Sequence, residues 1–464
     1  MTTVDQAKQH FDRGVELEEQ GKTAEAVDEY RAALAFDPED AHAHYNLGGC
    51  LAKIDRFEEA LVEAEAAAAL DPDDADHLSL LGCVLIDLDR NEEAAEVLAK
   101  ALSLEPEDAG ANYNLALALS QSNRDDDALR YAEAAAARGP DDADTLDLLG
   151  RVLFDLDRYE ESVSACRKAV ALSPGDSSYH WSLGSALSWS EQYQEAAAEY
   201  REAIRLGENE GGIWESLGFA LGEQGRHEEA IAAYQQAIAI DPNEADYHLR
   251  LADTLDDLGR NEEAVAEYRE SIRLEDCPQA RYNLGHALSV LDRQGDAVVE
   301  YREAIRLDPN DVDHHYSLGL TLMDLERYSE AATALQEAVR LQPDDYDSHY
   351  QLAWAYEETE RWEESTAEYK EAARLEPDNW WPHFNLGGVL RKQERWEEAL
   401  AEYQAALKLN TQDADIHFMM GWCLDELGRL EESAQAYREG LRLDPDDEDA
   451  REELDLILKK MESA

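Results

Sequence analysis

One short repeat decides the fold, because it recurs along most of the chain. From Ala41 to Asp74 the repeat reads AHAHYNLGGCLAKIDRFEEALVEAEAAAALDPDD. Leu47 and Leu51 lie at helical spacing in its first half. Ala60 and Ala67 have the same kind of spacing in its second half, where small side chains allow two helices to approach closely. The repeat therefore predicts two short helices joined by a tight turn.

Proline gives the repeat its period. It returns every 34 residues in two series, Pro38, Pro72, Pro106, Pro140, Pro174 and Pro242, and then Pro309, Pro343, Pro377 and Pro445. Glu208 and Thr411 hold the equivalent place in two repeats, and the register slips by one residue near Asp276 and Cys277. Proline ends a helix because it has no amide proton and clashes with the preceding turn. Thirteen repeats fit between residues 7 and 447, and the eighth has 33 residues.

The turn between the two helices has a pattern of its own. It often carries Gly, Asp or Asn followed by a base, as in Asp55-Arg56 and Asn123-Arg124. Gly and Asn tolerate the left-handed conformation that closes a helix. A base here suits the negative end of the preceding helix dipole, and acids such as Glu58 suit the positive start of the next helix.

These positions together resemble the tetratricopeptide repeat family. Two repeats show the match to the family pattern of small residues, large residues and a proline. The matching residues are Leu47-Gly48, Ala60, Ala67 and Pro72 in one repeat, and Leu217-Gly218, Ala230, Ala237 and Pro242 in the other. The family's usual Trp at the fourth position remains only as Trp214, and eight repeats carry His there: His10, His44, His180, His248, His315, His349, His383 and His417. The resemblance implies an all-α fold, a right-handed α-solenoid of about thirteen 34-residue helix-turn-helix repeats with a concave inner face.

The expected organisation has three parts. Residues 1–6 are an N-terminal extension, residues 7–447 are the repeats, and residues 448–464 form a C-terminal capping helix. In that last segment Leu454, Ile457 and Leu458 share one face, which predicts that the helix closes the final repeat.

Charge excludes several classes of partner. The chain has 464 residues with 106 acids and 41 bases, a net charge of −65. Such a surface repels phosphate backbones and anionic membranes, so we expect neither nucleic acid nor membrane as a partner. Abundant carboxylates with only 10 Lys resemble a halophilic protein, since repulsion of this size is damped only at high salt. An acidic scaffold from a low-salt cell is the alternative.

The cysteines and the chain start predict a cytoplasmic protein. The five cysteines form no CxxC pair and their number is odd, which indicates reduced, buried thiols. The start MTTVDQAKQHFDRG has no apolar core for a signal peptide. No apolar run approaches the ~20 residues that cross a bilayer.

The sequence predicts no metal, no cofactor and no enzyme activity. The histidines at the fourth position lie on different helices, with axes at least ~8–10 Å apart, whereas zinc needs its ligands within about 2.0–2.1 Å. Acidic loops such as residues 70–77 lack the Gly and the distal Glu of an EF-hand, and Asp before a helix is an ordinary N-cap. No nucleophile, base and orienting residue occur together, and no Gly-rich phosphate loop precedes a helix.

The resemblance also points to the residues that line the inner face. In the family these are mainly positions 2, 5, 9, 12 and 13 of each first helix. Position 5 is aromatic in nine repeats: Phe11, Tyr45, Tyr113, Trp181, Tyr282, Tyr316, Tyr350, Phe384 and Phe418. The next position carries Asn46, Asn114, Asn283 and Asn385, which resembles in part the asparagine ladder of repeat proteins that hold extended polypeptides.

Near the C-terminus these positions depart from the family pattern. The stretch NWWPHFNLGGVLRKQERW, residues 379–396, is aromatic and locally basic. Its repeat, residues 380–413, has a net charge of −1, whereas the repeats on either side have −7 and −6. We expect a partner-binding site there, with basic side chains holding a carboxylate or phosphate and rings gripping an apolar side chain. Its expected residues are Tyr316, Tyr350, Trp354, Trp381, Phe384, Asn385, Arg391, Lys392, Phe418 and Trp422.

The resulting hypothesis is a non-enzymatic scaffold that binds a peptide or protein partner in the concave groove. Trp362 and Trp396, which follow the turn Arg, are expected to pack between helices instead. The carboxylate clamp of chaperone-binding family members is not reproduced, because position 5 is never Lys. Two alternatives stay open: a self-assembling structural solenoid, and an assembly or chaperone-like component that serves an enzyme encoded nearby.

Overall fold

The protein is entirely helical over the residues that the structure describes. This structure is a computed structural model that describes residues 3–463. Within that range 27 helices form thirteen helix-turn-helix pairs followed by a single helix, and there are no strands. The predicted all-α solenoid of repeats is confirmed. The described range leaves out residues 1 and 2 of the expected extension and residue 464 of the expected capping helix. The rest of the expected extension, residues 3–6, forms the start of the first helix.

The chain divides into two compact units, Met1–Asp241 and Pro242–Ala464, here called the N-terminal and C-terminal units. The N-terminal unit holds α1 (Thr3–Glu19), α2 (Thr23–Phe36), α3 (Ala41–Ala52), α4 (Phe57–Leu70), α5 (Ala75–Asp87), α6 (Asn91–Leu104), α7 (Ala109–Gln121), α8 (Asp125–Arg138), α9 (Ala143–Asp155), α10 (Tyr159–Leu172), α11 (Ser177–Trp189), α12 (Tyr193–Leu206), α13 (Gly211–Gly222) and α14 (His227–Ile240). The C-terminal unit holds α15 (Ala245–Asp257), α16 (Asn261–Leu274), α17 (Pro278–Val290), α18 (Gln294–Leu307), α19 (Val312–Asp324), α20 (Tyr328–Leu341), α21 (Tyr346–Glu358), α22 (Trp362–Leu375), α23 (Trp381–Lys392), α24 (Trp396–Leu409), α25 (Ala414–Glu426), α26 (Leu430–Leu443) and α27 (Glu448–Ser463).

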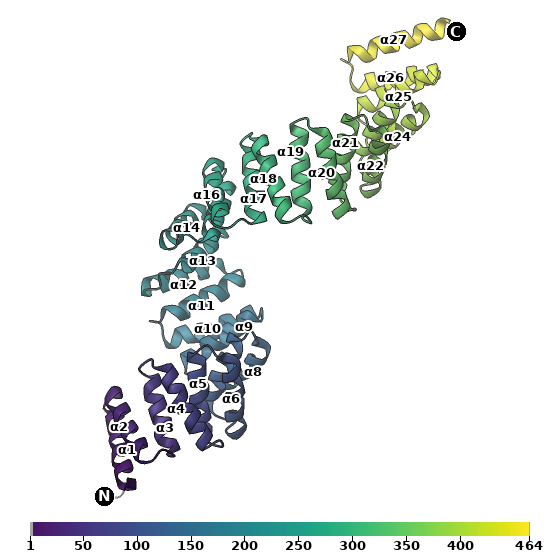
Figure 1. Cartoon of the computed structure of the whole chain (residues 1–464). Coiled ribbons are helices and arrows are strands. Elements are labelled where there is room, and N and C mark those ends of the chain that lie inside the picture. Colours follow the sequence, from purple (N-terminus) through teal and green to yellow (C-terminus); the bar gives the residue numbers. More distant parts are fainter. Residues whose placement is uncertain (1–2, 464) are drawn as a thin grey trace. The chain divides into compact units, whose positions relative to one another are not determined.

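Inside each unit the helix pairs stack in chain order (Figure 1). Within a unit, helices that are consecutive in the chain pack against each other. The first helices of successive repeats also touch one another, as α9 touches α11 in the N-terminal unit and α19 touches α21 in the C-terminal unit. The first helices, which carry odd numbers, therefore form a layer of their own, and we call it the first-helix layer.

The core of a pair depends on a glycine that faces a ring. In the pair α23–α24 a Cβ atom added to Gly387 would lie 2.7 Å from Cε1 of Tyr403, which is closer than real Cβ contacts. The same arrangement joins Gly218 to Tyr234 and Gly285 to Tyr301. Glycine is required at the eighth position of these repeats because the ring from the second helix occupies the space of a side chain. The two helices interlock there.

The turn within each pair contains one residue in the left-handed conformation, as the sequence pattern predicts. That residue is Gly, Asn or Asp in most repeats, with φ of 71° at Gly225 and 54° at Asn123. The structure adds glutamate to the set, since Glu360 adopts a φ of 57°. A non-glycine residue pays a steric cost in this region. Closing hydrogen bonds such as that from Arg361 N to Tyr356 O, at 2.8 Å, offset the cost.

The arginine after this residue forms an ion pair with the next helix, a partner that the dipole argument did not predict. Arg56 is the residue before α4, and its Nε donates to Glu59 Oε1 at 2.7 Å within the first turn of that helix. The same i,i+3 ion pair recurs in Arg90–Glu93, Arg158–Glu161, Arg226–Glu229, Arg260–Glu263, Arg327–Glu330, Arg361–Glu364, Arg395–Glu398 and Arg429–Glu432. The glutamate lies in the first turn of the second helix, near its positive end, and is close enough to the arginine to form the ion pair.

In most repeats the start of the first helix and the end of the second helix lie where the Asp and Pro positions predict them. The aspartate before a first helix caps it: Asp40 accepts the amides of His42 and Ala43, and Asp345 accepts the amide of Ser348. The second helix α4 ends at Leu70, two residues before its proline. However, α12 and α24 end at the equivalent place without a proline, so proline is not required to stop the helix.

The last helix closes the final repeat. Ile457 of α27 is buried, and Leu454 and Leu458 pack against the same apolar cluster, which contains Tyr437 of α26. Lys460 Nζ lies 2.6 Å from Asp425 Oδ2 on α25. The predicted capping helix is therefore present, with its apolar face toward the repeats.

Candidate functional site

Three tryptophans project from the C-terminal unit on first helices. Trp354 lies on α21 and is 43% exposed, Trp381 on α23 is 49% exposed, and Trp422 on α25 is 42% exposed. Arg391 and Lys392 lie at the end of α23. We call these five residues the aromatic surface. All five were expected from the sequence to belong to a partner-binding site.

Trp381 is held by other rings. It stacks on Trp380 with a centroid distance of 4.1 Å and an interplanar angle of 24°, and it meets Phe384 edge-on at 6.2 Å. Its backbone amide donates to Asn379 Oδ1 at 3.1 Å. Because one face of the indole is covered and its backbone is fixed, the exposed part of Trp381 is presented in a defined orientation.

Arg391 stacks on Trp422 and so joins α23 to α25. Its guanidinium carbon lies 4.0 Å from the centroid of the Trp422 ring, which is the geometry of a cation–π contact. Within residues 3–463 no carboxylate lies within ion-pair distance of Arg391, and its buried Nε has no hydrogen-bond partner. In a chain with 106 acids, an arginine without an acid partner keeps N–H donors that an acid of another molecule can accept.

Lys392 differs from the expectation that it would hold an anion. Its Nζ lies 3.2 Å from Glu357 Oε1 on α21 and 5.1 Å from the centroid of the Trp362 ring. The Glu357 carboxylate already neutralises the ammonium, so an incoming anion would have to compete with it. Lys392 joins α23 to α21, and of the two bases Arg391 alone is left without an acid.

Tyr350 and Asn385 interact with each other. Asn385 Nδ2 donates to the hydroxyl of Tyr350 at 2.6 Å, across neighbouring first helices. Two other asparagines of the expected ladder behave alike: Asn114 Nδ2 donates to Cys83 Sγ at 3.0 Å, and Asn283 Nδ2 to Asp253 Oδ1 at 2.8 Å. Their amide protons bridge adjacent repeats, and the carbonyl oxygen of Asn283 is also engaged, since it accepts from Gln279 Nε2 at 2.8 Å.

The remaining expected site residues are more deeply placed. Phe418 is only 6% exposed and packs on Tyr437 and Gly440, so it belongs to the core and we leave it out of the site. Phe384 is half-buried between Trp381 and Tyr403. Tyr316, on α19, is half-buried, and burial raises the pKa of its hydroxyl to about 12. Trp362 and Trp396 pack against the core, as predicted.

The histidines at the fourth position make a recurring internal pair. Nδ1 of His349 lies 2.6 Å from Glu368 Oε2 on the second helix, and its Nε2 lies 3.0 Å from the carbonyl oxygen of Pro343. His44 and His180 have the same two partners in their own repeats. At His349 both partners of the ring are acceptors, so the protonated ring can donate to both, and these bonds favour its imidazolium form. Among the described residues no three potential ligands gather to hold a metal ion.

His349 and His417 are expected to titrate on opposite sides of the ordinary histidine pKa. Burial alone lowers the pKa of His349, but its bonds to Glu368 and Pro343 outweigh burial and raise it. At His417, where Ala436 replaces the glutamate, burial lowers the pKa. The His349 pair therefore stabilises the fold fully below about pH 6.5, the unfolded value, and this contribution is lost as pH rises through the raised pKa. Neutral His417 contributes above about pH 6.5, and its contribution is lost as pH falls through its lowered pKa.

NMR titration of the imidazole Cε1–H signals measures both values. The matched variant is Ala436→Glu, which supplies the missing acid and is expected to raise the pKa of His417. A His417 pKa that does not move in this variant, or a His349 pKa below that of His417, contradicts the assignment.

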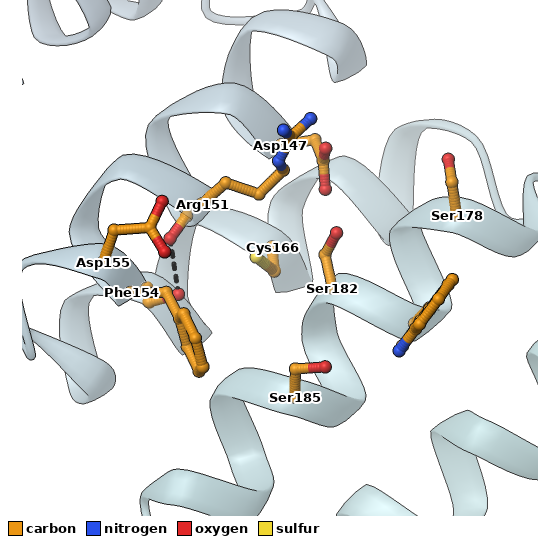
Figure 2. Close-up of a pocket in the computed structure, with 11 residues that line it drawn as sticks. Asp147, Arg151, Phe154, Asp155, Cys166, Ser178, Ser182 and Ser185 are labelled. Atoms are coloured by element: carbon orange, nitrogen blue, oxygen red, sulfur yellow. Dashed lines mark hydrogen bonds between the residues drawn. The ribbon is translucent and has the colours of Figure 1, made fainter. Parts of the chain in front are cut away.

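A recess that the sequence did not lead us to expect lies in the N-terminal unit on α9, α10 and α11 (Figure 2). Its central residue is Asp147, at position 5 of its repeat, where nine repeats carry a ring. The signal was present in the sequence as a missing aromatic residue. The sequence indicates the recess only when Asp147 and Cys166, which are 19 residues apart, are considered together.

No helix within residues 3–463 combines the length and the apolarity that crossing a membrane requires.

Several solved structures resemble parts of the chain. The MamA protein is 25% identical and aligns with 36% of this chain and 92% of its own, with a TM-score of 0.35. YrrB, described as a TPR protein with an unusual peptide-binding site, is 20% identical and aligns with 39% of this chain and 95% of its own, with a TM-score of 0.36. A MamA fragment from Desulfovibrio magneticus RS-1 is 23% identical over 36% of this chain and 94% of its own, at 0.35. No curated protein matches the chain.

Family models match along most of the chain. The model described as tetratricopeptide repeat matches residues 11–75, 79–143, 118–177, 316–379 and 384–448. Two related models, described as TPR repeat and tetratricopeptide repeat, match residues 220–259, 292–325 and 245–276. Since the matches to the first model alone cover more than half of the 464 residues, and the helix pairs have the predicted form, the chain belongs to the tetratricopeptide repeat family.

Proposed function

We propose that the protein is a non-enzymatic scaffold that binds a peptide or protein partner on the aromatic surface of its C-terminal unit. The observation that carries the proposal is the exposure of Trp354, Trp381 and Trp422, at 43%, 49% and 42%, on three first helices in a row. Large apolar side chains that gather at a surface mark interaction sites. Tryptophan and arginine are also the residues that most often dominate the energy of an interface.

The surface favours a partner in which an apolar side chain lies next to a carboxylate. The stacked guanidinium of Arg391 has no acid partner among the described residues, and its planar fork can hold a carboxylate with two hydrogen bonds. The surrounding repeat is close to neutral, with a net charge of −1, whereas its neighbours at −7 and −6 repel an acid. The aromatic surface is thus the place on this unit where an acidic group meets least repulsion.

Trp422→Ala and Trp354→Ala are each expected to weaken partner binding by about 2 kcal/mol or more, roughly thirtyfold. The partner is first captured from lysate on the immobilised full chain in molar KCl and identified by mass spectrometry. Its affinity for each variant is then measured with purified proteins by calorimetry. Circular dichroism is expected to show unchanged helicity, because both rings lie on the surface.

Trp189→Ala is the matched control. Trp189 is an exposed tryptophan in the N-terminal unit, stacked on Tyr159 at 5.7 Å, and it lies outside the aromatic surface. Binding by this variant should equal that of the original protein. Unchanged affinity in both Trp422→Ala and Trp354→Ala refutes the proposal. A change in molecular mass on Trp422→Ala, seen by light scattering, instead identifies the partner as a second copy of the chain.

A further inference from the structure

A cavity of about 480 Å³ opens between α9, α10 and α11 in the N-terminal unit (Figure 2). It lies on the first-helix layer, and its walls include Asp147, Arg151, Phe154, Trp181 and Ser182. Arg151 occupies position 9 of its repeat, the position that Trp354 and Trp422 occupy in theirs. A polypeptide lying along the first-helix layer of this unit would pass over the opening.

Two rings found in other repeats are missing from the repeat that borders the cavity. In five repeats the aromatic residue at position 5 meets the tyrosine at position 24, as Phe384 meets Tyr403 at a centroid distance of 5.6 Å. In the pair α9–α10 the two positions carry Asp147 and Cys166 instead. The Cys166 thiol still covers Gly150, where an added Cβ would lie 2.3 Å from Sγ. The helices therefore stay in register, while the volume of the rings is left open.

Asp147 is a buried acid with one oxygen that lacks a hydrogen bond. The residue is only 8% exposed, and its Oδ1 has no partner in the structure. Burial raises the pKa of its carboxyl, and the Ser182 hydroxyl and the Arg151 guanidinium oppose this shift only in part. A buried acceptor without a donor is costly, and native proteins retain few of them. Rotation about χ2 of aspartate is soft, so either oxygen can turn to a donor in the cavity.

The charge around the cavity favours a cation as that donor. Asp147 and Asp155 line the cavity, and Asp144 and Asp176 lie close enough to act on Asp147, whereas Arg151 is the one base of the lining. Arg151 is exposed at the rim and has no carboxylate within ion-pair distance among the described residues. The rings of Phe154 and Trp181 add faces that attract a cation and cover an aliphatic stem.

We propose that this cavity binds a cationic side chain, lysine or arginine, of a polypeptide partner, with Asp147 accepting its N–H group. The rings of Phe154 and Trp181 enclose the stem of that side chain, and Ser182 supplies a second polar contact. The site lies in the N-terminal unit, so it is a binding site beyond the aromatic surface and does not depend on it. Figure 2 shows the Asp147 carboxyl and the Ser182 hydroxyl facing the same space.

Fluorine NMR on the full chain labelled with 5-fluorotryptophan tests the proposal, because Trp181 lines the cavity. The Trp181 resonance is identified as the signal that Trp181→Phe removes. The probes are blocked pentapeptides with lysine, arginine, norleucine or glutamine between glycines. The Trp181 resonance is expected to shift saturably with the lysine or arginine peptide and not with norleucine or glutamine, in 0.15 M KCl.

Asp147→Asn is expected to weaken binding of the cationic peptide by about tenfold or more. Asp126→Asn is the matched control, since it removes one charge from an exposed acid on α8 and leaves the cavity intact. The urea midpoint of Asp147→Asn should equal or exceed that of the original protein, because a buried carboxylate with an unpartnered oxygen destabilises the fold. This second measurement separates a lost contact from a lost fold.

Three results overturn the proposal. The first is a Trp181 resonance that responds equally to norleucine and lysine peptides, or saturably to none. The second is an Asp147→Asn variant that binds as tightly as Asp126→Asn. The third is lysine amide alone binding as tightly as the lysine pentapeptide, which would assign the cavity to a free cation and not to a polypeptide.

Discussion

Replacing Tyr403 with alanine is expected to lower the free energy of unfolding of the C-terminal unit by about 3–5 kcal/mol. The Tyr403 ring is 1% exposed, and it fills the space over Gly387 and meets Phe384 at 5.6 Å. Removing it leaves a cavity between α23 and α24 that the glycine cannot fill, and the lining loses its contacts. Urea unfolding followed by circular dichroism measures the loss.

The loss should stay local, because repeats in a solenoid contact only their neighbours. Hydrogen exchange is expected to rise in α23 to α26 and to stay unchanged in the N-terminal unit. Tyr403→Phe is the matched control, since it keeps the ring and removes only the hydroxyl, and it should cost less than about 1.5 kcal/mol. If Tyr403→Ala costs no more than Tyr403→Phe, the ring over the glycine does not hold the pair together.

The second large effect expected is that of salt. Lowering KCl from molar to millimolar concentration should lower the midpoint of thermal unfolding by roughly 10 °C or more. The net charge of −65 makes the folded chain repel itself, and the Debye length grows from about 3 Å at 1 M to about 30 Å at 0.01 M. The short ion pairs across the turns, such as Arg56–Glu59, involve exposed side chains and compensate little of this repulsion.

Calorimetry at a series of KCl concentrations measures the effect. The control is a variant in which several exposed acids that form no ion pair within the described part of the chain, such as Asp126, Glu92 and Glu160, become amides. Its midpoint should depend less steeply on salt. A midpoint that is flat or higher at low salt contradicts the expectation and, with it, the prediction of a halophilic protein.

Much of the fold could be predicted because its signals are local. The 34-residue proline series, the spacing of Leu47 and Leu51 and the alanines of the second helix each act within a few turns of helix. Local spacing also predicted the Asp40 cap and the apolar face of α27. The ion pairs of the turn arginines were not predicted, since a dipole argument alone cannot show that Glu59 is a partner of Arg56.

The candidate site could be predicted only in part. The sequence placed Trp354, Trp381 and Trp422 on the first helices, and the structure exposes all three. The sequence also predicted Phe418 as a residue of the site, but Gly440 on α26 leaves room for that ring to turn inward. Whether a ring at position 5 lies on the surface depends on the residue opposite it on the second helix.

The sequence by itself determined that the chain is a row of paired helices, how long each pair is and where each one ends, because those properties follow from contacts within a single repeat. The tertiary structure alone decided which groups meet between helices. It paired Lys392 with Glu357, stacked Arg391 on Trp422 and left Oδ1 of Asp147 without a donor beside an open cavity. The physical reason is that these contacts depend on how side chains of two helices fill a common space, and periodicity along one helix does not carry that information.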